Sequence, residues 1–384
     1  MSKNVAKPTI KNAVKIELKS NLQNEKIKNK YFEELKEKEG FAEATINAHK
    51  KAIYRYEEFS GFEDFRQFNK KKAIEYKNWL EEKKVPQTNK QISLTTVYHY
   101  IRNLKRFFEW IAIQPDYKTK LNLSDVGYLK LPKAKSRIAI AARRERFPTV
   151  EQVKKVVESI EIKSEIDLRD RALICFTLLS GMRDKAIITL PISCFDKTKM
   201  FINQDPKQGV ETKFSKNIKS YLFNFDETMV KYFLEWYEYL KTEKLFGNAD
   251  PIFPRNKVVN AENSLSFVSN EVEPMFWQSA TSIRDIFKQR FEHAGIEYFS
   301  PHCFRHLAIL TALDGCKNGF QVKAVSQNFG HESITTTLTT YGTLNQNQMY
   351  ETITGMDFTE SSSSDGQLMQ KIKALIAQEG KGNF

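Results

Sequence analysis

The segment SPHCFRH, residues 300–306, brings together three side chains that bind anions or carry protons. The protein has only six histidines, and two of them flank an arginine here. In a helix, His302, Arg305 and His306 take positions i, i+3 and i+4, so all three project from one face. Such a face suits a polar surface stripe, a metal site or a pocket for an anion, and other segments decide between them.

Further candidate side chains lie in three other segments. Arg183 follows an apolar helix in LLSGMRDKAIITL, and Lys207 lies in QDPKQGVETK, between two short predicted strands. NFGHESITTTLTTYG supplies His331 and, ten residues later, Tyr341. Arginines, a lysine, histidines and a tyrosine without clustered carboxylates fit phosphate chemistry that uses no metal.

Each of these residue types has a chemical reason to meet a phosphate. An arginine fork binds two phosphate oxygens and stays charged as a pentacovalent transition state develops. A lysine or histidine can give a proton to the leaving oxygen. A tyrosine hydroxyl, with an ordinary pKa of about 10, becomes a nucleophile only beside cations and a base.

Taken singly, the same residues have structural explanations. Arg183 by itself is more often paired with a carboxylate, and histidines are often satisfied core side chains. A zinc site built from His302, His306 and His331 lacks a cysteine or carboxylate at ligand spacing, so we expect no metal and no cofactor. Lys207 competes with other lysines of its connection, which are Lys213, Lys216 and Lys219.

The charge of the chain favours a polyanionic partner. The 384 residues carry a formal charge of +13, with a pI of about 9.3, and basic proteins of this size usually meet nucleic acid. A lysine-rich solvated surface is the alternative explanation. Because there is neither a membrane-spanning apolar run nor an apolar signal core, and the four cysteines form no CxxC pair, we expect a cytoplasmic protein.

Periodicity predicts mainly α structure with a small β-sheet, in two domains. Helical patterns fill the first third of the chain, and the second part mixes helices with the strands MFINQ and SYLFNF. Thr149 with Gln152 predicts a capping box at the start of the second domain. The expected order is a flexible basic arm (1–26), a helical bundle (27–131), a basic linker (132–148), a larger second domain (149–357) and a serine-rich hinge with a C-terminal helix (358–384).

The predicted linker is a candidate nucleic-acid contact. It carries six basic side chains against one glutamate, and basic residues close to phosphates gain affinity by releasing counterions. An ordinary solvated connector is the competing interpretation. The six are Lys133, Lys135, Arg137, Arg143, Arg144 and Arg146.

The ordered set of motifs resembles the tyrosine recombinases, also called the phage integrase family. The matching pieces are SGMR, DPKQGV, PHCFRH, FGHESITTT and TYG, in the family's order and roughly its spacing. The resemblance runs from about residue 28 to about residue 350, and LTTVYHYIRNLKRFFEW looks like part of the family's core-binding domain. Each piece is weak by itself, and the ordered set is specific.

The resemblance implies a role for each candidate. Arg183 and Arg305 would clamp the scissile phosphate, and His302 would accept a proton or hydrogen-bond the phosphate. Lys207 would be the general acid, and His331 would contact the phosphate. Tyr341 would be the nucleophile that forms a 3′-phosphotyrosine. The implied activity is DNA integration, excision or resolution by strand exchange, without ATP or a metal.

Three details depart from the family pattern. Ala186 stands where the family usually has an acid, which leaves Asp184 or another side chain to support Arg183. Phe329 replaces the usual leucine before the Gly-His pair. The spacing of ten residues from His331 to the tyrosine is one longer than in many members, and Tyr350 is the fallback nucleophile.

The implied partners are double-stranded DNA sites, a homotetramer on synapsed DNA and, as a further partner, an accessory DNA-bending or directionality protein. The apolar side of the C-terminal helix would pack on a neighbouring protomer. Two alternatives remain open: a non-cutting DNA-binding relative of the same fold, and an enzyme that relaxes DNA like a type IB topoisomerase. The residues do not distinguish a phage, transposon or chromosome-resolution role.

Overall fold

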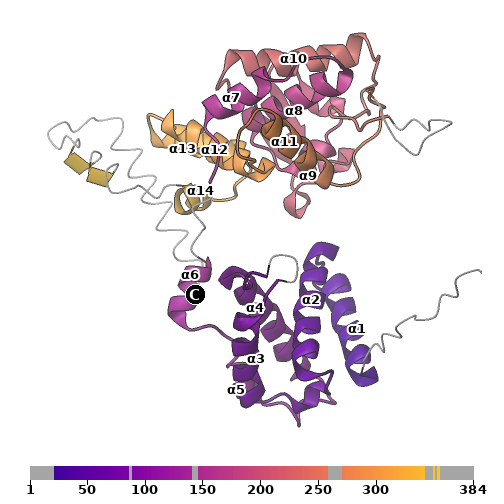
Figure 1. Ribbon diagram of the computed structural model, residues 1–384, viewed down its shortest axis with the longest axis vertical. Coiled ribbons are helices and arrows are strands. Elements are labelled where there is room, and N and C mark those ends of the chain that lie inside the picture. Colours follow the sequence, from indigo (N-terminus) through magenta and orange to yellow (C-terminus); the bar gives the residue numbers. More distant parts are fainter. Residues whose placement is uncertain are drawn as a thin grey trace, which may run out of the picture. The chain divides into compact units, whose positions relative to one another are not determined.

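The computed structural model describes residues 21–85, 89–140, 146–257, 270–341, 349–350 and 353–354. Contacts between residues divide the chain into two units, Met1–Arg144 and Glu145–Phe384. Each unit has its own hydrophobic core, and Figure 1 traces the helices that make up each unit.

The first unit is a bundle of helices. The apolar side of one helix, Leu94–Ile111, packs mainly against the helix Glu43–Ser60. Within this core, Phe108 stacks on Phe68 with ring centroids 4.0 Å apart. The helices are α1 (Leu22–Glu37), α2 (Glu43–Ser60), α3 (Lys70–Glu82), α4 (Leu94–Ile111), α5 (Leu123–Val126) and α6 (Lys133–Ile140).

Helix α1 begins earlier than the sequence predicted. Asn21 caps it with its side chain, and Asn24 in its first turn is fully buried. The Asn24 Oδ1 accepts the backbone N–H of Phe65 at 3.1 Å, which ties this turn to the chain beyond α2. The prediction of a flexible arm was therefore wrong for residues 22–26, and residues 1–20 lie outside the described part.

The predicted linker 132–148 contains a helix. Helix α6 packs on α4, where the Thr95 hydroxyl donates to the carbonyl of Ala139 at 3.0 Å. Ala139 is buried in this contact. The first part of the segment therefore belongs to the first unit. The division between the units lies within the predicted linker, between Arg144 and Glu145.

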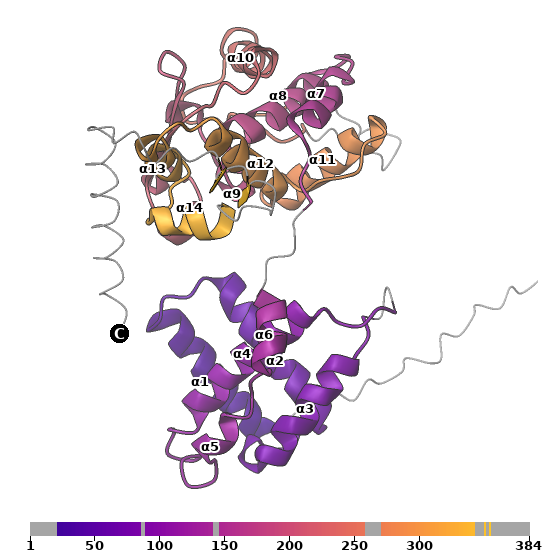
Figure 2. The same cartoon turned by 90° about the vertical axis from the view of Figure 1, so that its left-hand side faces the viewer.

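The second unit is mainly helical and holds the sheet. The capping box predicted at Thr149 and Gln152 is confirmed at the start of its first helix. The helices are α7 (Val150–Glu158), α8 (Glu165–Ser180), α9 (Asp184–Ile188), α10 (Glu227–Thr242), α11 (Thr281–His293), α12 (Pro301–Asp314), α13 (Gly319–Asn328) and α14 (Ile334–Tyr341). Helix α14 packs against α12 and α13 (Figure 2).

Helix α8 is largely buried in the core of this unit, and α10 and α12 pack against it. Its buried charges are paired. Asp170 accepts from Arg169 Nη2 and from Arg290 Nη2 of α11, each at 2.7 Å. The helix ends at Gly181 with a φ of 55°, as the sequence predicted.

The sheet is antiparallel, with strand order β1-β2-β3 for β1 (Phe195–Asp196), β2 (Phe201–Gln204) and β3 (Ile218–Tyr221). Strand β2 lies where it was predicted, β3 begins two residues before the predicted segment SYLFNF, and β1 is too short to show alternation. At the edge, Asn328 Oδ1 accepts the N–H of Tyr221 at 2.7 Å, and Asn328 Nδ2 donates to the Tyr221 carbonyl at 3.0 Å. A side-chain amide thus takes the place of a neighbouring strand at this residue.

These elements confirm the predicted fold class, mainly helical with a small β-sheet. Within the described ranges, none of the helices has the length and apolarity that crossing a membrane requires.

Candidate active site

Arg305 is held by three acceptors from two segments, the end of α8 and the turn after α13. Its Nη1 donates to the carbonyl of Gly181 at 2.8 Å, and its Nη2 donates to the carbonyl of Phe329 at 2.6 Å. Nη2 also lies 3.2 Å from Nε2 of His331. Because only 5% of Arg305 is exposed, these acceptors replace the water that the guanidinium loses. The side chain is therefore held in one orientation on α12.

Two glycines allow these segments to approach each other. Gly181 and Gly330 have φ values of 55° and 68°, a conformation that favours glycine. A Cβ on Gly181 would lie 2.2 Å from Cε1 of Phe329, and a Cβ on Gly330 would lie 2.8 Å from Cδ1 of Ile218. The end of α8, the turn after α13 and strand β3 can meet around Arg305 because both positions lack a side chain.

His331 links the arginine to helix α14. On its far side, Nδ1 lies 2.7 Å from Oγ1 of Thr337, and the Thr337 hydroxyl donates to Oγ of Ser326 at 2.9 Å. Burial first, and then the positive charges of Arg305 and Arg183, lower the pKa of His331 to about 4. The imidazole is therefore neutral at pH 7 in the absence of a bound anion.

Arg183 is part of the same electrostatic cluster, since its charge acts on His331. It is half-buried and precedes α9 as the N-cap residue. Asp184, one of the predicted supports for Arg183, pairs with Arg284 of α11, whose Nη2 lies 2.6 Å from Asp184 Oδ2. Ala186 is buried in the core, so the position where the family usually has an acid contributes packing.

His302 and His306 form a pair on the first turns of α12. Their Nε2 atoms lie 3.4 Å apart and their ring centroids 5.0 Å apart. His302 is exposed, whereas Arg305 on the same helix is buried. The helix face predicted to carry His302, Arg305 and His306 is therefore exposed at His302 and buried at Arg305.

Lys207 is exposed in the connection between β2 and β3. Its backbone N–H donates to Asp205 Oδ1 at 2.9 Å, which shapes the turn. The same connection reaches the segment after His331 through an ion pair between Lys216 and Glu332. The loop that carries the candidate acid is therefore tied to the histidine, and which lysine acts as the acid stays a prediction.

Tyr341 is the last residue of α14, and its side chain lies outside the described part. The backbone of α14 reaches it from Thr337, one helical turn earlier. Tyr350, the fallback nucleophile, is 68% exposed.

The predicted DNA-contacting residues fall into three groups. Lys133, Lys135 and Arg137 are exposed on α6, where Lys135 pairs with Glu81 at 2.6 Å. Arg146 is exposed and lies 3.7 Å from Glu297. Arg143 and Arg144 lie outside the described residues.

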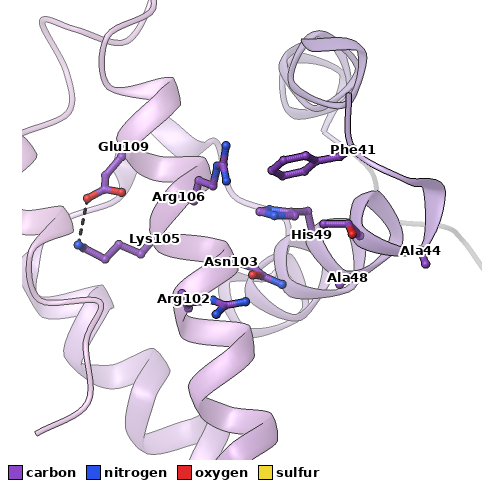
Figure 3. Close-up of a pocket in the computed structure, with 10 residues that line it drawn as sticks. Phe41, Ala44, Ala48, His49, Arg102, Asn103, Lys105, Arg106 and Glu109 are labelled. Atoms are coloured by element: carbon purple, nitrogen blue, oxygen red, sulfur yellow. Dashed lines mark ion pairs between the residues drawn. The ribbon is translucent and has the colours of Figure 1, made fainter. Parts of the chain in front are cut away.

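Sequence reasoning missed a basic groove between α2 and α4 in the first unit. Figure 3 shows Arg102 and Arg106 of α4 across from His49 of α2, with Phe41 opposite Arg106. The Arg106 guanidinium lies 4.7 Å from the Phe41 ring centroid. Sequence reasoning also missed the contact of His331 with Thr337 and Ser326, for which the sequence carries no local signal. Across the described ranges, no three His, Cys, Asp or Glu side chains group as a metal site would require.

Comparison with known proteins identifies the class to which this fold and cluster belong. The model of the phage integrase family matches residues 146–348, which is more than half of the chain. The chain therefore belongs to the phage integrase family.

Individual relatives are distant. The chain is 22% identical over 325 residues to a probable integrase/recombinase of Aquifex aeolicus (strain VF5), covering 81% of this chain and 93% of that protein. It is 25% identical over 253 residues to tyrosine recombinase XerD of Proteus mirabilis, covering 63% and 66% of the two chains.

Two solved structures share the fold. A lambda integrase (75–356) dimer bound to a COC′ core site matches with a TM-score of 0.56 and 13% identity, over 88% of this chain and 99% of that one. XerH recombinase bound to difH substrate matches with a TM-score of 0.53 and 16% identity, over 86% and 84%. At these identities the likeness establishes the fold only.

Proposed function

We propose that the protein is a site-specific tyrosine recombinase that cuts and rejoins double-stranded DNA through a 3′-phosphotyrosine intermediate. The observation that carries the proposal is the cluster in which a buried, oriented Arg305 contacts His331, with the charge of Arg183 close by. This cluster lies within the part of the chain matched by the phage integrase family. Two guanidinium groups whose charges act on one histidine suit a phosphodiester.

In the proposed reaction, the Tyr341 oxygen attacks the phosphorus of one strand. The new bond is O–P to tyrosine, and the bond that breaks is P–O to the 5′ oxygen, which leaves with a proton from Lys207. His302 takes the tyrosine proton, and Arg183 and Arg305 balance the charge on the phosphate oxygens. The phosphodiester energy is kept in the protein–DNA bond, so reversal with another 5′ hydroxyl completes strand exchange.

Basic residues of the first unit would bind the DNA backbone. On α6, Lys133, Lys135 and Arg137 are exposed, and the groove of the first unit adds Arg102 and Arg106. Contacts of this kind bind phosphates and position the protein without reading sequence.

Four copies of the chain would act on two duplexes through a Holliday junction. The C-terminal helix predicted within residues 358–384 lies outside the described residues; we propose that its apolar side packs on a neighbouring copy, and that an accessory DNA-bending or directionality protein takes part. Such an enzyme would work in the cytoplasm, on the nucleoid when bound to DNA.

The first experiment is a trapping assay on nicked DNA from the flanks of the protein's gene. Wild type is expected to give a protein–DNA adduct that survives SDS, and Tyr341→Phe is expected to give none. Tyr350→Phe is the matched control, because it removes the same hydroxyl from an exposed tyrosine. An adduct that persists in Tyr341→Phe and disappears in Tyr350→Phe would move the nucleophile.

The same assay separates the alternatives. Tight binding without an adduct on any flank would favour the non-cutting DNA-binding relative. Cleavage at any sequence, with relaxation of supercoils and no pairing of sites, would favour the topoisomerase-like enzyme.

A further inference from the structure

A chain of hydrogen bonds runs from the core of the second unit to Arg305, the candidate phosphate ligand. It passes from Ser326 of α13 to Thr337 of α14, then to His331, and ends at Arg305 of α12. Ser326 and Thr337 are 2% and 0% exposed. The carbonyl of Ser326 also accepts the backbone N–H of His331, at 3.1 Å. Buried polar groups that are paired in this way specify one arrangement.

The donor directions along this chain follow from its ends. A guanidinium only donates, so Nε2 of His331 must accept from Arg305. A neutral imidazole then carries its proton on Nδ1 and donates it to Oγ1 of Thr337. The Thr337 hydroxyl in turn donates to Ser326. Because the Thr337 hydroxyl gives its own proton to Ser326, its oxygen accepts from Nδ1 and so supports the tautomer in which His331 can hold the arginine.

Thr337 also lies one turn before Tyr341 on α14. The hydrogen bond from His331 is consequently made to the helix that ends at the candidate nucleophile. If α14 moved away, Nδ1 would lose its acceptor and the orientation of Arg305 would lose a support.

We propose that Thr337, supported by Ser326, is a positioning residue. It holds the proton of His331 on Nδ1, leaves Nε2 to accept from Arg305, and so couples docking of α14 to orientation of the arginine. The kinetic part of this inference rests on the proposed recombinase function. The assignment of the His331 tautomer concerns the DNA-free protein and does not depend on that function.

The test compares Thr337→Val, Thr337→Ser and Thr336→Val. Valine keeps the shape of threonine and removes the hydroxyl, serine keeps the hydroxyl, and Thr336 gives the same change at an exposed position of the same helix. Single-turnover adduct formation is expected to fall about tenfold in Thr337→Val, the effect of one hydrogen bond. Thr337→Ser and Thr336→Val are expected to stay within about twofold of wild type, and DNA affinity is expected to be unchanged in all three.

A double-mutant cycle with His331→Ala shows whether Thr337 acts through the histidine. Thr337→Val is expected to add less than about twofold in that background, because the link is already lost. The proposal would be overturned if Thr337→Val lowered adduct formation equally in the wild-type and His331→Ala backgrounds. It would also be overturned if Thr337→Ser lowered adduct formation as much as Thr337→Val does. Either result would mean that Thr337 contributes packing alone.

Nitrogen NMR of histidine-labelled, DNA-free protein provides the readout that does not need activity, with His331→Ala assigning the signal. We expect a protonated Nδ1 on His331 in wild type and in Thr337→Ser, and a changed Nδ1/Nε2 distribution in Thr337→Val. A protonated Nε2 in wild type would overturn the assignment. If wild type forms no adduct at all, the recombinase proposal fails while this measurement still decides the tautomer.

Discussion

Replacing Gly181 with alanine is expected to destabilise the second unit through a single contact. The new Cβ would lie 2.2 Å from Cε1, 3.0 Å from Cδ1 and 3.2 Å from Cζ of Phe329. The ring cannot simply move aside, because it stacks on Phe223 at 5.3 Å and lies under the Arg305 guanidinium at 5.3 Å. Overpacking of this kind costs about 1–3 kcal/mol, and alanine at a φ of 55° adds about 1 kcal/mol.

The expected loss is therefore about 2–4 kcal/mol in the free energy of unfolding. Gly295→Ala is the matched control, since its φ is 67° and its Cβ would meet nothing within 4 Å. That variant is expected to lose only the conformational part, about 1 kcal/mol. The contact with Phe329 is then the difference between the two variants.

Urea unfolding measures both losses. The protein has four tryptophans, and replacing Trp79 and Trp110 with phenylalanine leaves the fluorescence of the second unit, from Trp236 and Trp277. In a Phe329→Leu background the cost of Gly181→Ala should fall toward that of Gly295→Ala, because the ring is gone. Equal losses for the two glycine variants, within about 0.5 kcal/mol, would refute the reasoning.

Three further predictions concern charge. Burial first, and then Arg106 and Arg102, lower the pKa of His49 to about 4. The unfolded chain therefore binds the histidine proton more tightly than the folded chain does. Folding stability of about 3 kcal/mol is consequently lost as pH falls from 6.5 to 4. Acid titration of the fluorescence of the first unit should show this loss, and His49→Gln should remove it. Asp170→Asn leaves buried arginines short of a partner and should cost about 3–5 kcal/mol in urea unfolding, whereas Asp196→Asn, at a half-buried position, should cost under about 1 kcal/mol. Replacing Lys133 and Arg137 with glutamine should lower the slope of log K against log salt for DNA binding by roughly 2; an unchanged slope would place α6 away from phosphates.

Local signals made much of the fold predictable. The capping box of Thr149 and Gln152 and the stop at Gly181 are each encoded within a few residues. The hydrophobic spacing of α4 likewise needs no distant partner. By contrast, α6 was missed because its support comes from α4, where Thr95 binds the carbonyl of Ala139. The start of α1 was missed for the same reason, since buried Asn24 looks like a surface residue in the sequence.

The candidate site shows the same difference between features encoded locally and features that depend on distant residues. The residue types and order pointed to Arg305 and His331, and the structure brings these two into contact. The sequence could not select Thr337 from the run of threonines around it, because its partner is defined only when α13 and α14 pack together. The approach of Gly181 to Phe329 was equally hidden, since those residues are far apart in the chain.

The amide of Asn328 has a consequence for how copies of this protein meet. An unpaired edge strand is a template on which a strand of another molecule can extend the sheet. Both backbone groups of Tyr221 at the end of β3 are already taken by Asn328. A strand arriving from another copy would first have to break two hydrogen bonds there. Asn328 therefore closes the Tyr221 position of this edge to strand addition, which matters for a protein proposed to gather in several copies on one stretch of DNA.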